Sequence, residues 1–394
     1  MIKNLTHRFL FSALFFALAS TLFFMSLASF SSAQANDAEI EPTKVTNKHF
    51  KVISTYTGID FIQGEPLLLP KNNVVLFVDR HQDRDNLRDS SKDTYTLDAI
   101  DISDINNPIF LKTLINFTTG SSILDFAVTE DEKQLFVTTG GRLLVYDISN
   151  FNNIVFKETI QLIGNGSLAL STDNKLLFAS GCINNNNCDY ITIFKLSPFP
   201  KFFTELQTNG NHGIVLSKDS KKIAYVGTDS TRVILANLST SYKVKILDSD
   251  YSTYNNRGSW KTSADIKQMI FSPDGNTLFV AGNQGGVIVY DVSDDKLNKI
   301  QQTAGAHWGA LFNNTGSIFS LDITHNTLYM AGASRKVYSE TPKIKNITNS
   351  FYFPGSHIKL SPSNNIIMIH VNTNYSAPGS IIFISKRTEP HTKK

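Results

Sequence analysis

The sequence predicts an all-β protein, a seven-bladed β-propeller of four-stranded antiparallel blades that is closed by an N-terminal outer strand. Three recurring phrases support this prediction: a Ser-x-Asp turn before an apolar strand, an apolar run that ends in Asp-x-Ser, and a further strand-like run. Together they repeat every 40 to 60 residues or so, which is about the length of a four-stranded blade. Several such units around one axis bury each other's faces.

The first phrase predicts the turn between the first and second strands of each blade. Its clearest copy is FSPDGNTLFVAG, which begins at Phe271. The first turn positions of the copies lie at residues 70, 129, 171, 217, 272, 322 and 361. Seven anchors predict seven blades.

The second phrase predicts the third strand. Its copies are Leu97–Ser103, Leu143–Ser149, Ile191–Ser197, Val233–Ser239, Val287–Ser293 and the shorter Ile381–Ser385. These runs are apolar almost throughout, which is typical of strands covered on both faces. The Asp-x-Ser ending favours a tight turn, because Asp and Ser side chains hydrogen-bond the backbone just beyond them. The sixth copy, around RKVYSE, is degenerate.

The third phrase predicts the outer strand and also the closure of the ring. Asn107–Gly120 is its first copy, whereas the last blade ends at Ile384 without one. Lys48–Gly58 matches the outer-strand phrase and precedes the first inner strand. We therefore expect this N-terminal segment to complete the last blade, which leaves no open strand edge.

These residues resemble known propeller repeats. LDAIDISDINNPIFLKTL and LLVYDISNFNNIVFKETI resemble the LVIVD repeat of bacterial exported propellers, and FSPDGNTLFVAG is similar to the YVTN-type repeat of surface-layer and lactonase-like proteins. The resemblance covers about Leu69 to Ser385. It implies the fold and says little about function, because propellers carry many unrelated activities. The degenerate sixth copy departs from the pattern.

The chain begins with an expected export signal. Lys3 and Arg8 precede the apolar stretch Phe9–Phe30, and Ala33-Gln34-Ala35 is a small-x-small cleavage site, the order found in a secretory signal peptide. The apolar stretch is long enough to remain as an N-terminal anchor instead. The expected organisation is a signal peptide at 1–35, a flexible linker at 36–47, the propeller at 48–386 and a basic tail at 387–394. The compartment would be periplasmic, cell-surface or extracellular.

Charge and cysteine content limit the function classes. The net charge of +3 falls to +1 when the leader takes away Lys3 and Arg8, so we expect no nucleic-acid partner. After signal cleavage no membrane insertion is expected, and a monomer is expected. Cys182 and Cys188 close a small loop and predict a disulfide in an oxidising compartment.

Unequal loop lengths predict where a site lies. Antiparallel order puts the strand 2–3 and strand 4–1 connections on one face, and most of the long ones belong to this class: Asp79–Asp93, the Cys182–Cys188 loop, Asp248–Asp265, Gly305–Gly316 and Asn372–Gly379. Function concentrates on loops held by a rigid scaffold. The main hypothesis is therefore a non-catalytic propeller that binds a protein or glycan partner through this face.

Aromatic and arginine side chains are the usual anchors of partner contacts. The expected partner-binding residues on this face are Tyr251, Tyr254, Arg257, Trp260, His307 and Trp308. The alternative interpretation is that these rings pack the long loops onto the blades.

Three further sets of residues leave alternatives open. Arg142 and Arg232 take equivalent places at the start of third strands, where they would bind an anionic ligand or pair with a carboxylate of a neighbouring blade. His212, His307 and His357 fit blade-internal hydrogen bonds better than a metal ring. Asp79, Asp83, Asp85, Asp89 and Asp93 alternate with arginines and lack a glycine, which favours a solvated, internally paired loop over a calcium loop.

Nothing in the sequence predicts a cofactor, a metal or a catalytic residue. It contains no Gly-x-Ser-x-Gly elbow and no phosphate-binding loop. The alternative to the binding hypothesis is a lactonase-like hydrolase acting on a small molecule at the channel mouth, which the resemblance implies. His307, Arg142 and Arg232 would serve it, although no general acid–base pair is recognisable.

Overall fold

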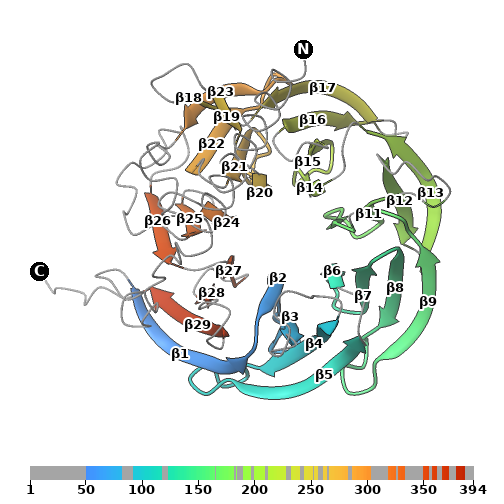
Figure 1. Ribbon diagram of the computed structural model, residues 1–394, viewed down its shortest axis with the longest axis vertical. Coiled ribbons are helices and arrows are strands. Elements are labelled where there is room, and N and C mark those ends of the chain that lie inside the picture. Colours follow the sequence, from blue (N-terminus) through green and yellow to red (C-terminus); the bar gives the residue numbers. More distant parts are fainter. Residues whose placement is uncertain are drawn as a thin grey trace, which may run out of the picture.

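The computed structural model describes residues 50–81, 92–117, 123–164, 166–181, 183, 190–196, 199–208, 212–227, 232–239, 244–251, 253–255, 261–263, 266–282, 286–302, 318–324, 327–332, 349–354, 357–361, 366–371 and 379–386. Over these residues the chain consists of strands and turns, and no helix there could span a membrane. Figure 1 shows the sheets following one another around a common centre, a propeller-like arrangement. The expected leader, linker and basic tail lie outside the described residues.

Six sheets have four strands each, paired antiparallel in sequence order except where noted. The first three are sheet I with β2 (Ile62–Leu69), β3 (Val74–His81), β4 (Thr94–Asp101) and β5 (Ile109–Phe117); sheet II with β6 (Ile123–Val128), β7 (Gln134–Thr139), β8 (Arg142–Asp147) and β9 (Val155–Gln161); and sheet III with β10 (Leu168–Leu170), β11 (Leu176–Ser180), β12 (Tyr190–Leu196) and β13 (Pro200–Gln207).

The next two sheets repeat this order. They are sheet IV with β14 (His212–Leu216), β15 (Lys222–Val226), β16 (Arg232–Leu238) and β17 (Val244–Tyr251), and sheet V with β20 (Ile266–Phe271), β21 (Thr277–Gly282), β22 (Gly286–Asp291) and β23 (Asn298–Gln302). Between them lies a two-stranded ladder of β18 (Thr253–Asn255) and β19 (Lys261–Ser263).

The last two sheets depart from simple sequence order. Sheet VI has β24 (Ile318–Ile323), β25 (Thr327–Gly332) and β26 (Asn349–Pro354). Sheet VII joins the two ends of the described chain, because β1 (Phe50–Ile59) pairs antiparallel with β29 (Gly379–Lys386), which is followed in the sheet by β28 (Ile366–Val371) and β27 (His357–Leu360). Figure 1 shows β1 beside β29.

The apolar cores lie between neighbouring sheets. Second strands such as β3, β11 and β21 are buried over most of their length, since sheets cover both of their faces. One core joins sheets I and II, for example through Leu97 and Val137, and another joins sheets VII and I through Phe383 and Phe77. Outer strands are half exposed: Phe110, Phe156 and Phe202 each expose about half of their surface.

The predicted Ser-x-Asp turns are confirmed at four positions, and the structure gives the reason for the pattern. The predicted first turn position 322 is wrong, because Asp322 lies inside β24, where its carboxylate bonds Leu360 of β27. In the turn at Ser171, the hydroxyl donates to Asp173 Oδ1 (2.7 Å) and accepts the N–H of Leu176 (2.9 Å), while Asn174 takes a left-handed conformation with φ of 53°. The turns beginning at Thr129, Ser217 and Ser272 repeat this arrangement. The Asp-x-Ser turns are confirmed as well, since Asp101, Asp147 and Asp291 accept the N–H of the Ser two residues on.

The strand ends form two edges of the arrangement of sheets, and the longest connections lie along one of them. The trimmed edge, as we call it, carries the strand 1–2 and 3–4 turns, and none of these between the described strands is longer than the segments 102–108 and 148–154. The elaborated edge carries the strand 2–3 and 4–1 connections, which include 82–93, 252–265 and 303–317.

Two expectations about strands are corrected. Asp248–Tyr251, expected to begin a long loop, instead extends β17, because Asp248 and Asp250 are held by sheet V: Asp248 Oδ2 accepts the N–H of Leu297 (2.9 Å), and Tyr290 donates to Asp250 (2.9 Å). The sixth blade, expected to be antiparallel and four-stranded, has three described strands with β25 and β26 parallel. A parallel pair needs a long crossover connection, and residues 333–348 are numerous enough for one.

Candidate functional site

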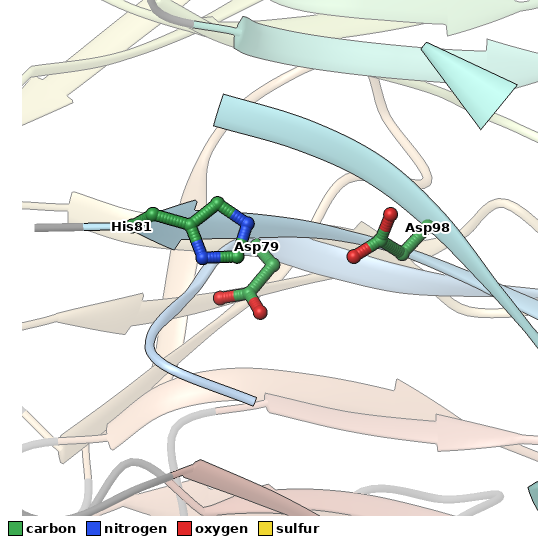
Figure 2. Close-up of side chains that lie close together, drawn as sticks. All are labelled: Asp79, His81 and Asp98. Atoms are coloured by element: carbon green, nitrogen blue, oxygen red, sulfur yellow. The ribbon is translucent and has the colours of Figure 1, made fainter. Parts of the chain in front are cut away.

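A group of ionisable side chains lies where β3 and β4 approach the elaborated edge. Alternation along a strand places Asp79 and His81 on the same face of β3 as Phe77. The antiparallel register puts Phe77 opposite Asp98 and Asp79 opposite Thr96. Asp79, His81 and Asp98 therefore share one face, and one nitrogen or oxygen from each lies within 4.8 Å of the others. Figure 2 shows the Asp98 carboxylate pointing from β4 toward His81 and Asp79 on β3.

Asp79 fixes the connection between sheets VII and I. Its carboxylate accepts the N–H of Phe61 (2.9 Å) and of Asp60 (3.2 Å), both in the turn from β1 to β2. The N–H of Arg80 also donates to the carbonyl of Phe61 (2.8 Å). Asp79 is only 3% exposed, and its burial raises the pKa of the carboxyl, an effect that the two backbone N–H donors partly oppose.

His81 lies in a chain of hydrogen bonds. Its Nδ1 is 2.9 Å from Asp60 Oδ2, and its Nε2 is 3.1 Å from Thr96 Oγ1. Thr96 in turn donates to Asp98 Oδ2 (2.9 Å). Thr96 has one hydroxyl hydrogen and gives it to Asp98, so the Nε2 of His81 must act as the donor to Thr96.

Asp98 is the least satisfied member of the group. It is 6% exposed, and its Oδ1 has no hydrogen-bond partner. Burial raises the pKa of the Asp98 carboxyl, and the Thr113 and Thr96 hydroxyl groups oppose this rise. Tyr56 of β1 packs on Phe77 with ring centroids 6.5 Å apart, and its own pKa is raised by burial and then by Asp98 and Asp79.

The group is well suited to hold a proton or a cation. Two buried carboxylates face one imidazole, and among the described residues neither carboxylate pairs with a Lys or Arg. Arg80 forms its ion pair with Asp93 instead (2.5 Å). A buried negative charge without a partner is costly, so positive charge is favoured at this place.

Most of the predicted partner-binding residues are not described in atomic detail. Tyr251 ends β17 opposite Arg232, and Tyr254 pairs with Thr262 in the β18–β19 ladder. The remaining four, together with the two cysteines of the predicted disulfide, lie outside the described residues: Arg257, Trp260, His307, Trp308, Cys182 and Cys188.

Arg142 and Arg232 do occupy equivalent places, since they begin β8 and β16, the third strands of sheets II and IV. Sheet III lies between these two sheets (Figure 1), so the two arginines do not come from neighbouring sheets. His212 and His357 begin β14 and β27 on the inner side of the ring, as their positions before first strands predicted.

The expected acidic loop Asp79–Asp93 is corrected at its first end and in the exposure of its last residue. Asp79 belongs to β3, and Asp93 is 3% exposed and pairs with Arg80. The predicted internal pairing is thus confirmed for this pair, which is buried rather than solvated. Sequence reasoning missed His81 and Asp98 altogether. The signal was the alternation Asp79-x-His81 in an otherwise apolar strand, together with a lone acid inside the next one.

No family model matches the chain, and no curated protein matches it. Among solved structures it is similar to a protein from Lactobacillus plantarum, with 14% identity and a TM-score of 0.50, over 81% of this chain and 86% of that one. It also matches a functionally unknown protein from Desulfotomaculum acetoxidans DSM 771, with 13% identity and a TM-score of 0.45, over 61% of this chain and 71% of that one. At this identity the first similarity supports the fold alone.

Proposed function

We propose that the chain is an exported, non-catalytic, seven-bladed β-propeller that binds a protein or glycan partner through its elaborated edge. The observation that carries the proposal is the inequality of the two edges. Short turns tied by hydrogen bonds occupy the trimmed edge, whereas the connections 82–93, 252–265 and 303–317 belong to the other edge. Binding residues tend to lie on long loops held by a rigid scaffold.

The count of seven is supported by the contacts of the innermost strands. These contacts form a cycle, β2 with β6, β6 with β10, and onward through β14, β20, β24 and β27 to β2 again. Closure by the N-terminal strand is supported by the register of β1 on β29, from Phe50 opposite Lys386 to Ile59 opposite Gly379. On this proposal sheet VI is the sixth blade in spite of its parallel pair.

The relation to the LVIVD and YVTN-type repeats belongs to the same proposal. It is supported by hydrogen bonds that recur at the same positions of the repeated phrases. In several sheets the Asp of an Asp-x-Ser turn accepts the N–H of the Ser two residues on, and the first Ser of a Ser-x-Asp turn accepts the N–H five residues on. Repeats that conserve such turns stack as equivalent units.

The anchors of the proposed contact are Tyr251, Tyr254, Arg257, Trp260, His307 and Trp308. Aromatic and arginine side chains supply much of the binding energy in protein interfaces. The leader would deliver the chain to the periplasm, the cell surface or the medium as a monomer.

A capture experiment tests the proposal. The purified chain serves as bait for envelope proteins and for a glycan array, beside a variant whose residues 252–265 are replaced by a short Gly-Ser linker. The replacement begins after Tyr251, because Asp248 and Asp250 hold sheet V. A control variant carries Glu130→Ala and Lys133→Ala on the trimmed edge, where both side chains are exposed.

We expect the chain and the trimmed-edge variant to capture the same partner and the linker variant to lose it. Capture that persists without residues 252–265 would remove Tyr254, Arg257 and Trp260 from the proposal. Equal loss of capture in the linker variant and in the trimmed-edge variant would contradict a contact confined to the elaborated edge.

A further inference from the structure

We infer that Asp79, His81 and Asp98 bind a divalent cation of the zinc class at the elaborated edge of sheet I. This inference stands apart from the partner-binding proposal, because it concerns different residues and a different kind of ligand. Its basis is geometric: two carboxylates and one imidazole from adjacent strands offer ligand atoms within 4.8 Å of each other.

The second observation is the unsatisfied oxygen of Asp98. Oδ1 of this carboxylate is buried without a hydrogen bond, although more than nine tenths of the residue is shielded from solvent. Buried polar atoms are nearly always partnered, so an orphan calls for an explanation such as an ion. Figure 2 shows this carboxylate directed toward the two other members of the group.

Charge balance favours a divalent ion. Two buried carboxylates carry a charge of −2, and no Lys or Arg among the described residues compensates it. A divalent cation would neutralise both, whereas one proton on His81 would neutralise only one. The ion would take the place of the hydrogen that Nε2 now gives to Thr96.

The surroundings of His81 are those of a metal ligand. Its Nδ1 lies 2.9 Å from Asp60 Oδ2, which is the carboxylate contact that orients a ligating imidazole and leaves the other nitrogen free to coordinate. The side chain is 40% exposed, so an ion can enter from the elaborated edge.

The ligand types select the class of ion. Calcium and magnesium bind through oxygen atoms, whereas imidazole with carboxylates suits zinc and its first-row neighbours. Three protein ligands leave at least one position for water. The Thr96 hydroxyl, which contacts both His81 and Asp98, lies beside the group.

Calorimetry with zinc chloride tests the inference. The purified full chain is first stripped with a chelator and then titrated, beside Asp98→Asn and His81→Gln. The control is Asp101→Asn, which removes a carboxylate from the far end of the same strand, where Asp101 caps a turn. Circular dichroism establishes that each variant is folded.

We expect one zinc ion per chain, affinity at least tenfold weaker in Asp98→Asn and His81→Gln, and unchanged affinity in Asp101→Asn. Asp60→Asn should weaken binding 10- to 100-fold, the usual effect of removing an outer partner of a ligating histidine. Cobalt in place of zinc should give visible absorption bands that disappear in His81→Gln.

Two results would overturn the inference. One is the absence of stoichiometric zinc binding, which would leave a proton as the compensating charge. The other is zinc binding that Asp98→Asn and His81→Gln leave intact, which would assign the ion to other histidines or to the cysteines. Calcium binding that does not need His81 would likewise reject the zinc class.

Discussion

Single polar side chains join the first strands of neighbouring sheets. Asp125 in β6 accepts the N–H of Leu168 in β10 (2.8 Å), and Asp322 in β24 accepts that of Leu360 in β27 (2.9 Å). Gln268 in β20 accepts the N–H of Leu321 in β24 in the same way. Such bonds satisfy backbone groups at the inner side of each sheet, where a first strand has no further strand to pair with.

Asp125 makes one of these contacts sensitive to pH. Burial raises the pKa of its carboxyl to about 7, and the nearby Glu65 adds to the rise while the N–H groups of Leu168 and Phe126 oppose it. Between about pH 4 and pH 7 the folded chain therefore binds a proton that the unfolded chain has released. Stability falls as pH increases through this range, because the folded state is the one that holds more protons.

Asp125→Asn removes this titration. The amide keeps an acceptor for Leu168, so we expect the variant to gain stability relative to the native chain when pH rises from 5 to 8, measured by urea unfolding at both values. The control is Asp173→Asn, because hydrogen bonds, first that from Ser171, lower the pKa of Asp173. The effect of that substitution should be equal at the two pH values. A pH-independent effect of Asp125→Asn would contradict the raised pKa.

At the residue scale the sequence predicts local contacts and misses distant ones. The bonds from Asp147 to Ser149 and from Ser171 to Asp173 span two residues, and their spacing predicts them. The approach of Asp98 to His81 depends on the register of β3 on β4 across the connection 82–93, and the contact of His81 with Asp60 depends on how the turn between β1 and β2 lies against β3. No local pattern encodes either of them.

The turns of the trimmed edge interlock in series. Glu132 lies in the left-handed region with φ of 57°, is 5% exposed, and accepts the N–H of Lys71 (2.9 Å) and of Asn72 (3.1 Å) from the turn of sheet I. In the same way Asn174 accepts the N–H of Glu130 (3.1 Å). In sheets II, III and IV the fourth turn position therefore ties the sheet to the one before it.

Glu132→Ala should destabilise the fold. The substitution leaves two backbone donors of the neighbouring turn without their acceptor, and we expect a loss of about 2 kcal/mol in the free energy of unfolding, measured with urea. Glu132→Gly should lower the free energy of unfolding by only about 1 kcal/mol, because glycine adopts the left-handed conformation without strain. Glu130→Ala serves as the control, since its exposed side chain makes only a long contact (3.4 Å) with Asn174. Equal losses in Glu130→Ala and Glu132→Ala would reject the tie.

At the element scale the predictions fail where a strand depends on a neighbouring sheet. The second strands are predicted well, because their apolar runs are long and their turns are local. The extension of β17 through Asp248–Tyr251 reads as a polar loop, and the side chains of sheet V that hold it are distant in sequence. The parallel pairing of β25 with β26 follows a phrase too degenerate to predict any strand.

On the scale of the whole molecule, the first and last described strands meet in one sheet. β1 pairs with β29 over the whole length of both strands, and Lys359 of β27 reaches Glu65 of β2 (3.2 Å). Sheet VII therefore links to sheet I through covalent, apolar and ionic contacts. The likeness of Lys48–Gly58 to the outer-strand phrase is what made this pairing predictable, since the same pattern recurs wherever an outer strand is needed.

A disulfide across this pair tests how much the meeting contributes to stability. Thr57 lies opposite Ser380, and directly opposed residues of antiparallel strands have the separation that a disulfide requires. The bond would close a loop of more than 300 residues, for which the chain-entropy argument gives a gain above the roughly 4.7 kcal/mol of a 100-residue loop. We expect Thr57→Cys with Ser380→Cys to raise the melting temperature, and a reductant to abolish the rise.

The control closes a short loop inside one sheet, with Leu144→Cys and Thr159→Cys across β8 and β9. Its gain should be nearer to the roughly 3 kcal/mol expected of a 15-residue loop. If the ends separate early in unfolding, the long-range bond should also slow unfolding more than the short one does. An equal rise in melting temperature from both disulfides would mean that β1 and β29 separate only with the rest of the molecule. The pairing of β1 with β29 would then contribute no more to stability than any other strand pair.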